Sequence, residues 1–334
     1  MSGGKKTSNG DNQGPFWIGF DLGGTKMMAT VFDDSFEIVG KKRRRTKGEA
    51  GAKVGVERIV QTIRMALDNA DIKADQVRGI GVGCPSPVDL ERGIVLDAVN
   101  LGWKNVKLQK ALEETFSCRA VVLNDVDAGV YAENRLGAAQ KARCVLGVFP
   151  GTGIGGGCVY EGQIIHGLNS SCMEIGHVEV TPNGNLCGCG RRGCLETEAR
   201  RLAISAEVAK AAYRGEAPTL LKLAGTDLRE IRSGVLAKAI AGGDTVVEQI
   251  VRKAASLIGV AVANVVQLLC PDTVVLGGGL VEAMPELFVK EVARAARARV
   301  MPSYEDVFKV VAAELGDDAT VLGAAAWARH VVQE

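Results

Sequence analysis

The chain has 334 residues, which is enough for two domains of ordinary size, each with its own hydrophobic core. Its 40 lysines and arginines nearly balance 39 acidic residues, and the net charge of +1 argues against a general nucleic-acid or membrane-binding surface. The most apolar long segment, residues 254–270, is shorter than a membrane span requires and is predicted to be a buried helix.

Residues 1–15 are rich in Gly, Ser, Asn and Lys, lack the apolar core of a signal peptide, and are predicted to form a disordered tail. The nine cysteines are an odd number, and those outside the cluster described below show no pairing pattern, which favours reduced thiols in the cytoplasm. Five cysteines lie in or beside apolar strands and are predicted to be buried and inert: Cys84, Cys118, Cys144, Cys158 and Cys270.

The first predicted strand, residues 16–21, runs into D-L-G-G-T-K (21–26), and a second apolar run at 27–32 follows at once. The glycines are therefore predicted to turn a β-hairpin. Phosphate loops of the Walker and Rossmann types lead into a helix instead, so neither is predicted here. The basic run 41–47 follows a third strand-like segment and is interpreted as a solvated strand edge or loop, because Lys and Arg blunt exposed edges.

Helical and strand-like patterns alternate up to residue 125. In chain order they predict a helix at 54–69, a strand at 77–82, a loop at 83–89, a helix at 106–116 and a strand at 120–123. The last strand stops at Asn124 and Asp125. Polar groups at the C-terminal end of a parallel strand lie where open α/β sheets place their chemistry.

The pattern of residues 16–32 returns in the second half of the chain. An apolar strand at 144–149 leads into the glycine turn P-G-T-G-I-G-G-G (150–157), and strand residues resume at 158–160. Two copies of strand, Gly-Thr turn and strand predict a duplicated fold with two similar lobes facing each other.

A third glycine loop, G-G-G at 277–279, follows a strand at 273–276, as a duplication requires. Helices are predicted over most of 198–269 and 284–300. The small residues of L-G-D-D-A-T-V-L-G-A-A-A-W-A predict a tightly packed final helix.

Residues 174–196 combine candidate metal ligands with two acidic residues. Three thiolates and one imidazole make the ligand set of a closed tetrahedral zinc site, and free thiols or an oxidised pair are the alternative. The candidate ligands are His177, Cys187, Cys189 and Cys194, and the glycines that let the backbone turn between them are Gly188, Gly190 and Gly193. A closed site performs no Lewis-acid chemistry, so the metal is predicted to be structural.

The acidic residues that bracket the cluster suggest what the metal holds in place. Glu174, His177 and Glu196 are predicted to form a polar cluster fixed by the metal. Because imidazole has two ring nitrogens, His177 can bind zinc through one and a ligand hydroxyl through the other.

Each glycine loop alone is a weak signal, because the same residues also suit a plain hairpin. A Gly-Thr turn offers backbone N–H groups to an anion, Asp21 can organise Mg²⁺ through water, and Lys26 is a cation for phosphate oxygens. Two duplicated loops, a third loop and the pair Asn124–Asp125 together predict a nucleotide held between lobes. A carboxylate would then be available to take a proton from an attacking hydroxyl.

The motifs D-L-G-G-T-K, L-N-D, G-T-G-I-G-G-G, E-I-G-H and C-G-C-G-R-R-G-C-L-E occur in this order, and the sequence resembles the ROK family (repressors, open reading frames, sugar kinases) from about residue 17 to residue 327. The resemblance implies an α/β chain with the actin-like ATPase (ribonuclease H-like) fold. Two similar lobes, with mixed sheets flanked by helices, would enclose the active site in the cleft between them. The lobes would span 16–125 and 126–317, a final helix at about 318–331 would pack back on the first, and the protein would be a homodimer.

The resemblance also implies the reaction and its residues. Asp125 becomes the general base that lets the 6-hydroxyl of glucose take the γ-phosphoryl group of ATP, with Mg²⁺ bound and structural Zn²⁺ shaping the sugar loop. The sugar hydroxyls would be held by Asn124, Asp125, Glu174, His177 and Glu196. The phosphate loops would comprise Asp21, Gly23, Gly24, Thr25 and Lys26, and Gly151, Thr152, Gly153 and Gly155. The adenosine contacts would be Gly277, Gly278 and Gly279.

Within the family, a kinase for N-acetylmannosamine or fructose and a non-catalytic sugar sensor remain alternatives. A repressor is disfavoured, because about fifteen polar residues before the first strand are too few for a DNA-reading domain. Ser86, Cys172 and Met173 depart from the family's usual Gly, Ala and Gly. Met173 is predicted to pack into its lobe, and Asn100 lies in a stretch that resembles the far side of the sugar site in members that use glucose.

Overall fold

The computed structural model describes residues 14–48, 51–85, 87–98, 101–168 and 172–334. Ser86, Asn100 and nearly all of the predicted N-terminal tail lie outside the described residues. The chain divides into two compact units. One contains the chain up to Ala128 together with Thr320–Glu334, and the other contains Gly129–Ala319.

The first unit is built on a five-stranded sheet in the order β3-β2-β1-β4-β8. Its strands are β1 (Phe16–Leu22), β2 (Lys26–Phe32), β3 (Ile38–Arg45), β4 (Val77–Cys84) and β8 (Arg119–Asn124). Strands β1, β4 and β8 are parallel, whereas β2 is antiparallel to both β1 and β3. The basic run therefore lies on an edge strand, as predicted, with Lys41, Arg43 and Arg45 exposed.

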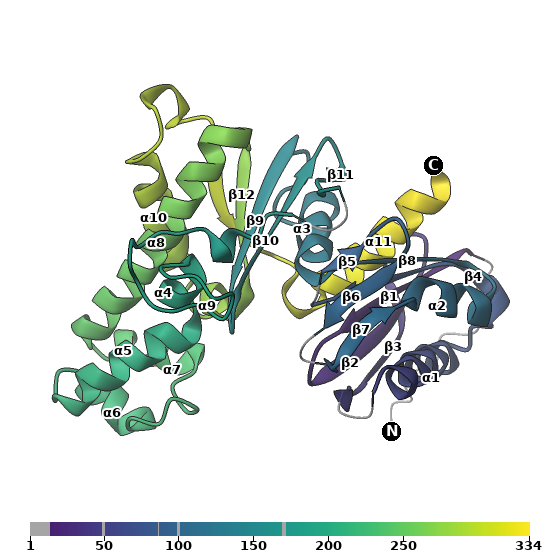
Figure 1. Cartoon of the computed structure of the whole chain (residues 1–334), viewed down its shortest axis with the longest axis horizontal. Helices are drawn as coiled ribbons and strands as arrows, with labels where there is room; N and C mark the ends of the chain where they lie inside the picture. Colours follow the sequence, from purple (N-terminus) through teal and green to yellow (C-terminus); the bar gives the residue numbers. More distant parts are fainter. Residues whose placement is uncertain (1–13, 49–50, 86, 99–100, 169–171) are drawn as a thin grey trace, which may run out of the picture. The chain divides into compact units, whose positions relative to one another are not determined.

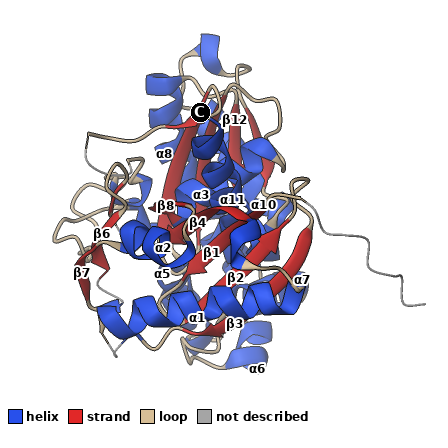
Figure 2. Ribbon diagram, turned by 90° about the vertical axis from the view of Figure 1, so that its right-hand side faces the viewer, coloured by secondary structure: helices blue, strands red, loops and turns tan. Residues whose placement is uncertain are grey.

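Helices cover both faces of this sheet. They are α1 (Ala52–Ala70), α2 (Leu108–Phe116), the start of α3 (Asp125–Arg135) and nearly all of α11 (Ala319–Gln333), with a 3-10 turn at Ala74–Gln76. Ile18 and Phe20 of β1 pack in one cluster with residues of α1 and α2, and α1 runs along the β2–β3 side of the sheet (Figure 2). On the opposite face Trp17 packs against Val321 of α11.

The final helix lies directly on the sheet because two strand positions carry no side chain. A Cβ atom at Gly19 would lie 1.8 Å from the Val321 carbonyl oxygen, and one at Gly81 would lie 1.8 Å from that of Ala324. Neither position can take another residue without moving α11. The small residues at the C-terminus therefore do pack tightly, as predicted.

One predicted loop and the start of one helix differ in the structure. Residues after β4 form a small antiparallel sheet of β5 (Val88–Asp89), β6 (Ile94–Ala98) and β7 (Trp103–Val106). The helix predicted from residue 106 begins at Leu108, since Val106 pairs with Val95 in that sheet. Strands this short contain too few alternations for the period-2 signal to stand out.

The second unit repeats the strand order with β11-β10-β9-β12-β13 (Figure 1). Its strands are β9 (Cys144–Pro150), β10 (Ile154–Tyr160), β11 (Gln163–Ile164), β12 (Thr273–Leu276) and β13 (Lys309–Ala312). Its longer helices are α5 (Arg201–Tyr213), α7 (Ser233–Ala241), α8 (Thr245–Leu269) and α10 (Pro285–Arg297). The shorter ones are α4 (Leu195–Ala199), α6 (Pro218–Ala224) and α9 (Gly278–Ala283), with 3-10 turns at Ile175–His177, Pro302–Tyr304 and Gly316–Asp318.

The duplication extends to single residues. In both sheets the first strand is antiparallel to the second and parallel to the fourth. Gly147 of β9 corresponds to Gly19 of β1, and a Cβ atom there would lie 2.1 Å from a methyl group of Val130 in α3. Each sheet thus uses a glycine in its first strand to seat a helix.

The exposure of two cysteines differs from the prediction. Cys84, Cys144 and Cys158 are buried, but Cys118 is half-buried and Cys270 is exposed at the end of α8. Cys270 has a φ angle of 47° in the C-cap of that helix, where the chain leaves the core. None of the helices that the structure describes has both the length and the apolar character needed to cross a membrane.

Candidate active site and metal centre

In the first unit, the predicted site residues gather at the C-terminal edge of the parallel strands. Asp21 pairs in register with Gly83 of β4, which pairs with Leu123 of β8, and Asn124 and Asp125 follow directly. The edge therefore brings Asp21 together with the Asn-Asp pair across three neighbouring strands.

Asn124 and Asp125 are positioned by the start of α3. The Asn124 Oδ1 accepts hydrogen bonds from the backbone N–H groups of Val126 (2.8 Å) and Asp127 (3.3 Å), so Asn124 is the N-cap of that helix. Asp125 is the first residue of the helix, and its carboxylate accepts a hydrogen bond from the Val126 N–H (3.0 Å). A carboxylate there is stabilised as the anion by the helix dipole. The Asn124 side-chain NH₂ donates to no other described residue and can therefore donate to a ligand.

The first predicted phosphate loop is braced from the end of β3. The Thr46 hydroxyl donates to the Gly23 carbonyl (2.6 Å), and its backbone N–H donates to the Thr25 carbonyl (2.9 Å). Arg58 of α1 in turn donates through Nε to the Thr46 carbonyl (3.1 Å). Gly24, Thr25 and Lys26 are exposed on this braced turn. Sequence reasoning missed Thr46, because a lone threonine after a basic run has no distinguishing pattern.

In the second unit, the two remaining glycine loops lie side by side. Strand β12 is parallel to β9, and the Gly277 N–H donates to the Val148 carbonyl (3.1 Å). A Cβ atom at Gly278 would lie 2.9 Å from the Pro150 carbonyl oxygen, next to Gly151. The loop predicted to bind adenosine is therefore seated directly on the second predicted phosphate loop.

The glycine run after this loop has a different backbone structure from the turn that was predicted. The turn is confined to Gly151–Gly153, and residues 155–157 belong to strand β10. A Cβ atom at Gly156 would lie 2.6 Å from the Met173 carbonyl oxygen, and one at Gly176 would lie 2.1 Å from that of Ile154. Gly156 and Gly176 therefore let the segment 173–176 lie against strand β10.

Glu174 lies in a tight backbone turn on this segment. The Ile175 N–H donates to the Met173 carbonyl (2.6 Å), which makes Glu174 the centre of an inverse γ-turn with φ −68° and ψ 55°. Met173 has a left-handed φ of 59°, a conformation that glycine adopts without strain. As predicted, its side chain packs against the hydrophobic core of its unit.

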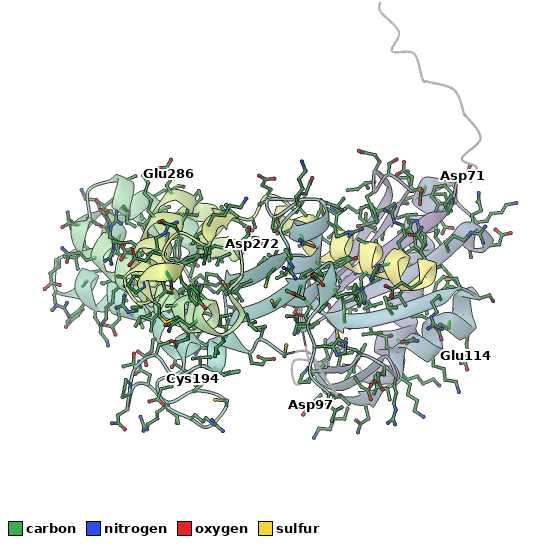
Figure 3. All side chains as sticks on the ribbon, turned by 90° about the horizontal axis from the view of Figure 1, so that it is seen from above. Asp71, Asp97, Glu114, Cys194, Asp272 and Glu286 are labelled. Atoms are coloured by element: carbon green, nitrogen blue, oxygen red, sulfur yellow. The ribbon has the colours of Figure 1, made fainter. Side chains whose placement is uncertain are left out.

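The four predicted metal ligands come together in the structure. The ligand atoms of His177, Cys187, Cys189 and Cys194 all lie within 4.8 Å of one another. The Cys189 and Cys194 sulfurs are 3.7 Å apart, and the Cys187 sulfur is 3.6 Å from His177 Nδ1. Figure 3 labels Cys194 within the loop that carries them.

These distances fit a tetrahedral zinc ion. Zn–S bonds of about 2.3 Å and Zn–N bonds of about 2.0 Å put two sulfurs about 3.8 Å apart and a sulfur and a nitrogen about 3.5 Å apart. A disulfide requires about 2.0 Å between sulfurs, so the geometry does not match an oxidised pair. The Nδ1 atom faces the sulfurs, which leaves Nε2 of His177 for a hydroxyl.

The loop that carries the candidate metal ligands, residues 177–194, contains two glycines with a positive φ angle and two cysteines with a shifted pKa. Gly190 and Gly193 have φ angles of 86° and 72°, whereas Gly188 does not have a positive φ and has open space around it. Burial raises the pKa of the Cys194 thiol to about 12. The backbone N–H of Arg191 lowers the pKa of the Cys189 thiol. A bound cation would hold all of these sulfurs as thiolates.

Glu196 connects the loop of candidate metal ligands, residues 177–194, to the second predicted phosphate loop. It stands two residues after Cys194, in α4, and its Oε2 accepts from the Ile154 N–H (3.1 Å). Its other oxygen lies 3.7 Å from the Arg200 guanidinium. The Arg201 N–H then donates to the Gly151 carbonyl (3.0 Å). Glu196, which is predicted to hold sugar, therefore also bonds the start of β10, the strand that follows the second predicted phosphate loop.

The fold defined by the two repeated sheets is that of the actin-like ATPases, and solved structures support it. A ROK glucokinase from Streptomyces griseus, in complex with glucose and AMPPNP, superimposes with a TM-score of 0.80 at 30% identity, covering 94% of this chain and 99% of that one. This chain has the mixed sheets flanked by helices that the fold requires.

The model of the ROK family matches residues 17–331, and the chain therefore belongs to the ROK family. It is 32% identical over 314 residues to a glucokinase from Halalkalibacterium halodurans, covering 92% of this chain and 93% of the relative. It is also 28% identical over 310 residues to a putative xylose repressor from Caldicellulosiruptor sp., covering 92% of this chain and 77% of the repressor.

Proposed function

We propose that this protein is an ATP-dependent hexose kinase that transfers the γ-phosphoryl group of ATP to the 6-hydroxyl of glucose. The observation that carries the proposal is the position of Asp125. Its carboxylate lies at the start of α3, at the same C-terminal edge of the parallel strands as Asp21. The proposal assigns proton acceptance to this carboxylate and phosphate binding to the glycine loops.

The chemistry needs a base and a set of charge-stabilising donors. A sugar hydroxyl has a pKa far above 7, so a positioned carboxylate that accepts its proton contributes about 10²–10⁴-fold in rate. Lys26 and the N–H groups of the turn at Gly151–Gly153 would stabilise the phosphoryl oxygens. Mg²⁺, when bound, would supply further positive charge to these oxygens, and Asp21 is the residue that would hold it through water.

The proposal assigns the binding of sugar hydroxyls to the Asn124 amide and the Asp125 carboxylate. It assigns the same role to Glu174, the Nε2 of His177 and Glu196. Zinc, held by His177, Cys187, Cys189 and Cys194, would keep the loop that carries them in one conformation, because closed zinc sites stabilise folded loops.

Glucose is the proposed substrate because the relatives of highest similarity reported above are glucokinases, one of them with bound glucose. The putative xylose repressor supports a second candidate, a sugar-binding regulator without catalysis. The two candidates differ in the use they make of Asp125 and the phosphate loops, because a sensor needs neither.

A coupled ADP-release assay against a panel of hexoses and N-acetylhexosamines tests the proposal. Glucose should give the highest kcat/KM, and Asp125→Asn should lower kcat by at least about 10²-fold while leaving the calorimetric Kd for glucose within about threefold. Asp75→Asn, an exposed carboxylate before β4, is the matched control and should match wild type. Turnover near wild type in Asp125→Asn would exclude the assigned base. Glucose binding without ADP release in any reaction would support the sensor.

A further inference from the structure

The turn of the second predicted phosphate loop is held at both ends by α4 and the first residue of α5. The Ile154 N–H, just after the turn, donates to Oε2 of Glu196 in α4 (3.1 Å). The Gly151 carbonyl, at the start of the turn, accepts from the backbone N–H of Arg201 (3.0 Å). Between these points the Gly151 N–H donates to the Gly153 carbonyl (2.8 Å). The conformation of the turn therefore depends on its bonds to α4 and α5.

The Glu196 carboxylate also lies directly against the backbone of this turn. A Cβ atom at Gly153 would lie 2.5 Å from Oε2 of Glu196, which is too close for a real contact. A Cβ atom at Gly151 would have no atom within 4 Å. Neither glycine has a positive φ angle, so the backbone of both positions accepts alanine. The missing side chain at Gly153 is therefore what leaves room for the carboxylate.

The backbone of Glu196 is fixed by its two neighbours in α4. The N–H of Leu195, which is buried, donates to the Val178 carbonyl (2.9 Å). The hydroxyl and the N–H of Thr197 both donate to the Cys194 carbonyl (2.8 and 3.0 Å). Because the backbone is held on both sides, the position of the carboxylate is set by the side-chain torsions of Glu196.

The second oxygen of this carboxylate is accessible to a ligand. Oε1 of Glu196 lies 3.7 Å from the Arg200 guanidinium, beyond hydrogen-bond distance. The side chains of Glu196 and Arg200 are 21% and 34% exposed. A sugar hydroxyl that donates to Oε1 would fix the carboxylate and leave the Ile154 N–H on Oε2.

We propose that Glu196 is a positioning residue for the second predicted phosphate loop as well as a sugar ligand, so that glucose and nucleotide each raise the affinity for the other. The inference rests on the proposed kinase function. A sugar that fixes the Glu196 carboxylate also fixes its bond to Ile154, so the turn is ordered before the nucleotide binds. The coupling is reciprocal, because both ligands stabilise the same conformation of the turn.

Calorimetry with AMPPNP, a non-hydrolysable ATP analogue, measures this coupling in the full chain with its metal content verified. Saturating glucose should lower the Kd for AMPPNP at least about fivefold, and saturating AMPPNP should lower the Kd for glucose by the same factor. A wild-type protein in which either ligand changes the other's Kd by less than about twofold would refute the coupling.

Two alanine variants of the same turn separate the positioning role from a general effect on the loop. The methyl group of Gly153→Ala would displace the flexible Glu196 side chain from the Ile154 N–H, so the effect of glucose on the Kd for AMPPNP should fall below about twofold. Gly151→Ala, which places its methyl group in open space, is the matched control and should keep the wild-type ratio of Kd values. Equal ratios in the two variants would exclude Glu196 as the link.

Hydrogen exchange at the Ile154 N–H tests the link without nucleotide. Glucose should slow this exchange at least about tenfold in wild type and in Gly151→Ala, and less than about twofold in Gly153→Ala. Exchange in wild type that saturating glucose leaves unchanged would contradict the inference, even if Gly153→Ala does not fold.

The same measurements distinguish this inference from the proposed reaction. Coupled binding in a protein that releases no ADP would overturn the reaction alone. Release of ADP by a protein with uncoupled binding would overturn the positioning role alone. A protein that binds no glucose would overturn both the proposed substrate and the role of Glu196.

Discussion

Thr46→Val is expected to weaken both the fold of the first unit and the affinity for ATP, because the Thr46 hydroxyl holds the turn at Gly23, which is proposed to bind phosphate. That hydroxyl belongs to a side chain that is 1% exposed and donates to the Gly23 carbonyl at 2.6 Å. Valine has nearly the same shape, so the substitution removes the hydrogen bond and leaves the packing intact. The bond from the Thr46 backbone N–H to Thr25 remains in the variant.

The expected magnitude follows from the surroundings of the two groups. Losing a buried hydrogen bond costs about 1–3 kcal/mol. Gly23 is half-buried, so its carbonyl can recover part of its bonding from water and about 1 kcal/mol is expected. If ATP binding must restore the same loop conformation, the Kd for ATP should rise about fivefold.

Thr30→Val is the matched control. Thr30 lies in β2 of the same sheet, is 0% exposed, and its hydroxyl has no hydrogen-bond partner among the described residues. Removing an unsatisfied buried hydroxyl should leave the free energy of unfolding unchanged or raise it by up to about 1 kcal/mol. Chemical denaturation and ATP calorimetry on both variants give the comparison. Equal unfolding free energies and equal ATP affinities in the two variants would refute the bracing role of Thr46.

Three further predictions concern the metal loop, the sugar loop and the thiols. Stripping the metal, or Cys187→Ser, should raise the Kd for glucose about 10–100-fold and open residues 178–193 to proteolysis; unchanged glucose affinity in verified metal-free protein would contradict this. Met173→Gly relieves the strain of a left-handed φ, about 1 kcal/mol, but removes the side chain that anchors the segment next to Glu174. The KM for glucose should therefore rise in Met173→Gly and stay near wild type in Met173→Leu. A Met173→Gly variant with a normal KM would show that the backbone turn needs no anchor. Burial raises the pKa of Cys118 to about 11, so this thiol stays protonated at every pH below that value. Mass spectrometry of alkylation at pH 8.5 should find exposed Cys270 modified at least about tenfold faster, and equal rates would contradict the shift.

Local patterns in the sequence were sufficient for most of the fold. Alternating and helical periodicity placed the long strands and helices to within a few residues, and the repeated strand, glycine turn and strand predicted the duplication that both sheets show. The spacing of one histidine and three cysteines predicted a cluster whose distances fit a tetrahedral metal.

Contacts between distant segments were decided only by the tertiary structure. The glycines at 155–157 were predicted as part of a turn, but Gly156 lies in a strand that the segment 173–176 covers. The hydroxyl of Thr46 reaches a loop 23 residues earlier, and Glu196 reaches an N–H group 42 residues earlier. A sequence pattern shows the hydrophobic periodicity of one segment. The partner of a side chain depends instead on which strands become neighbours in the sheet.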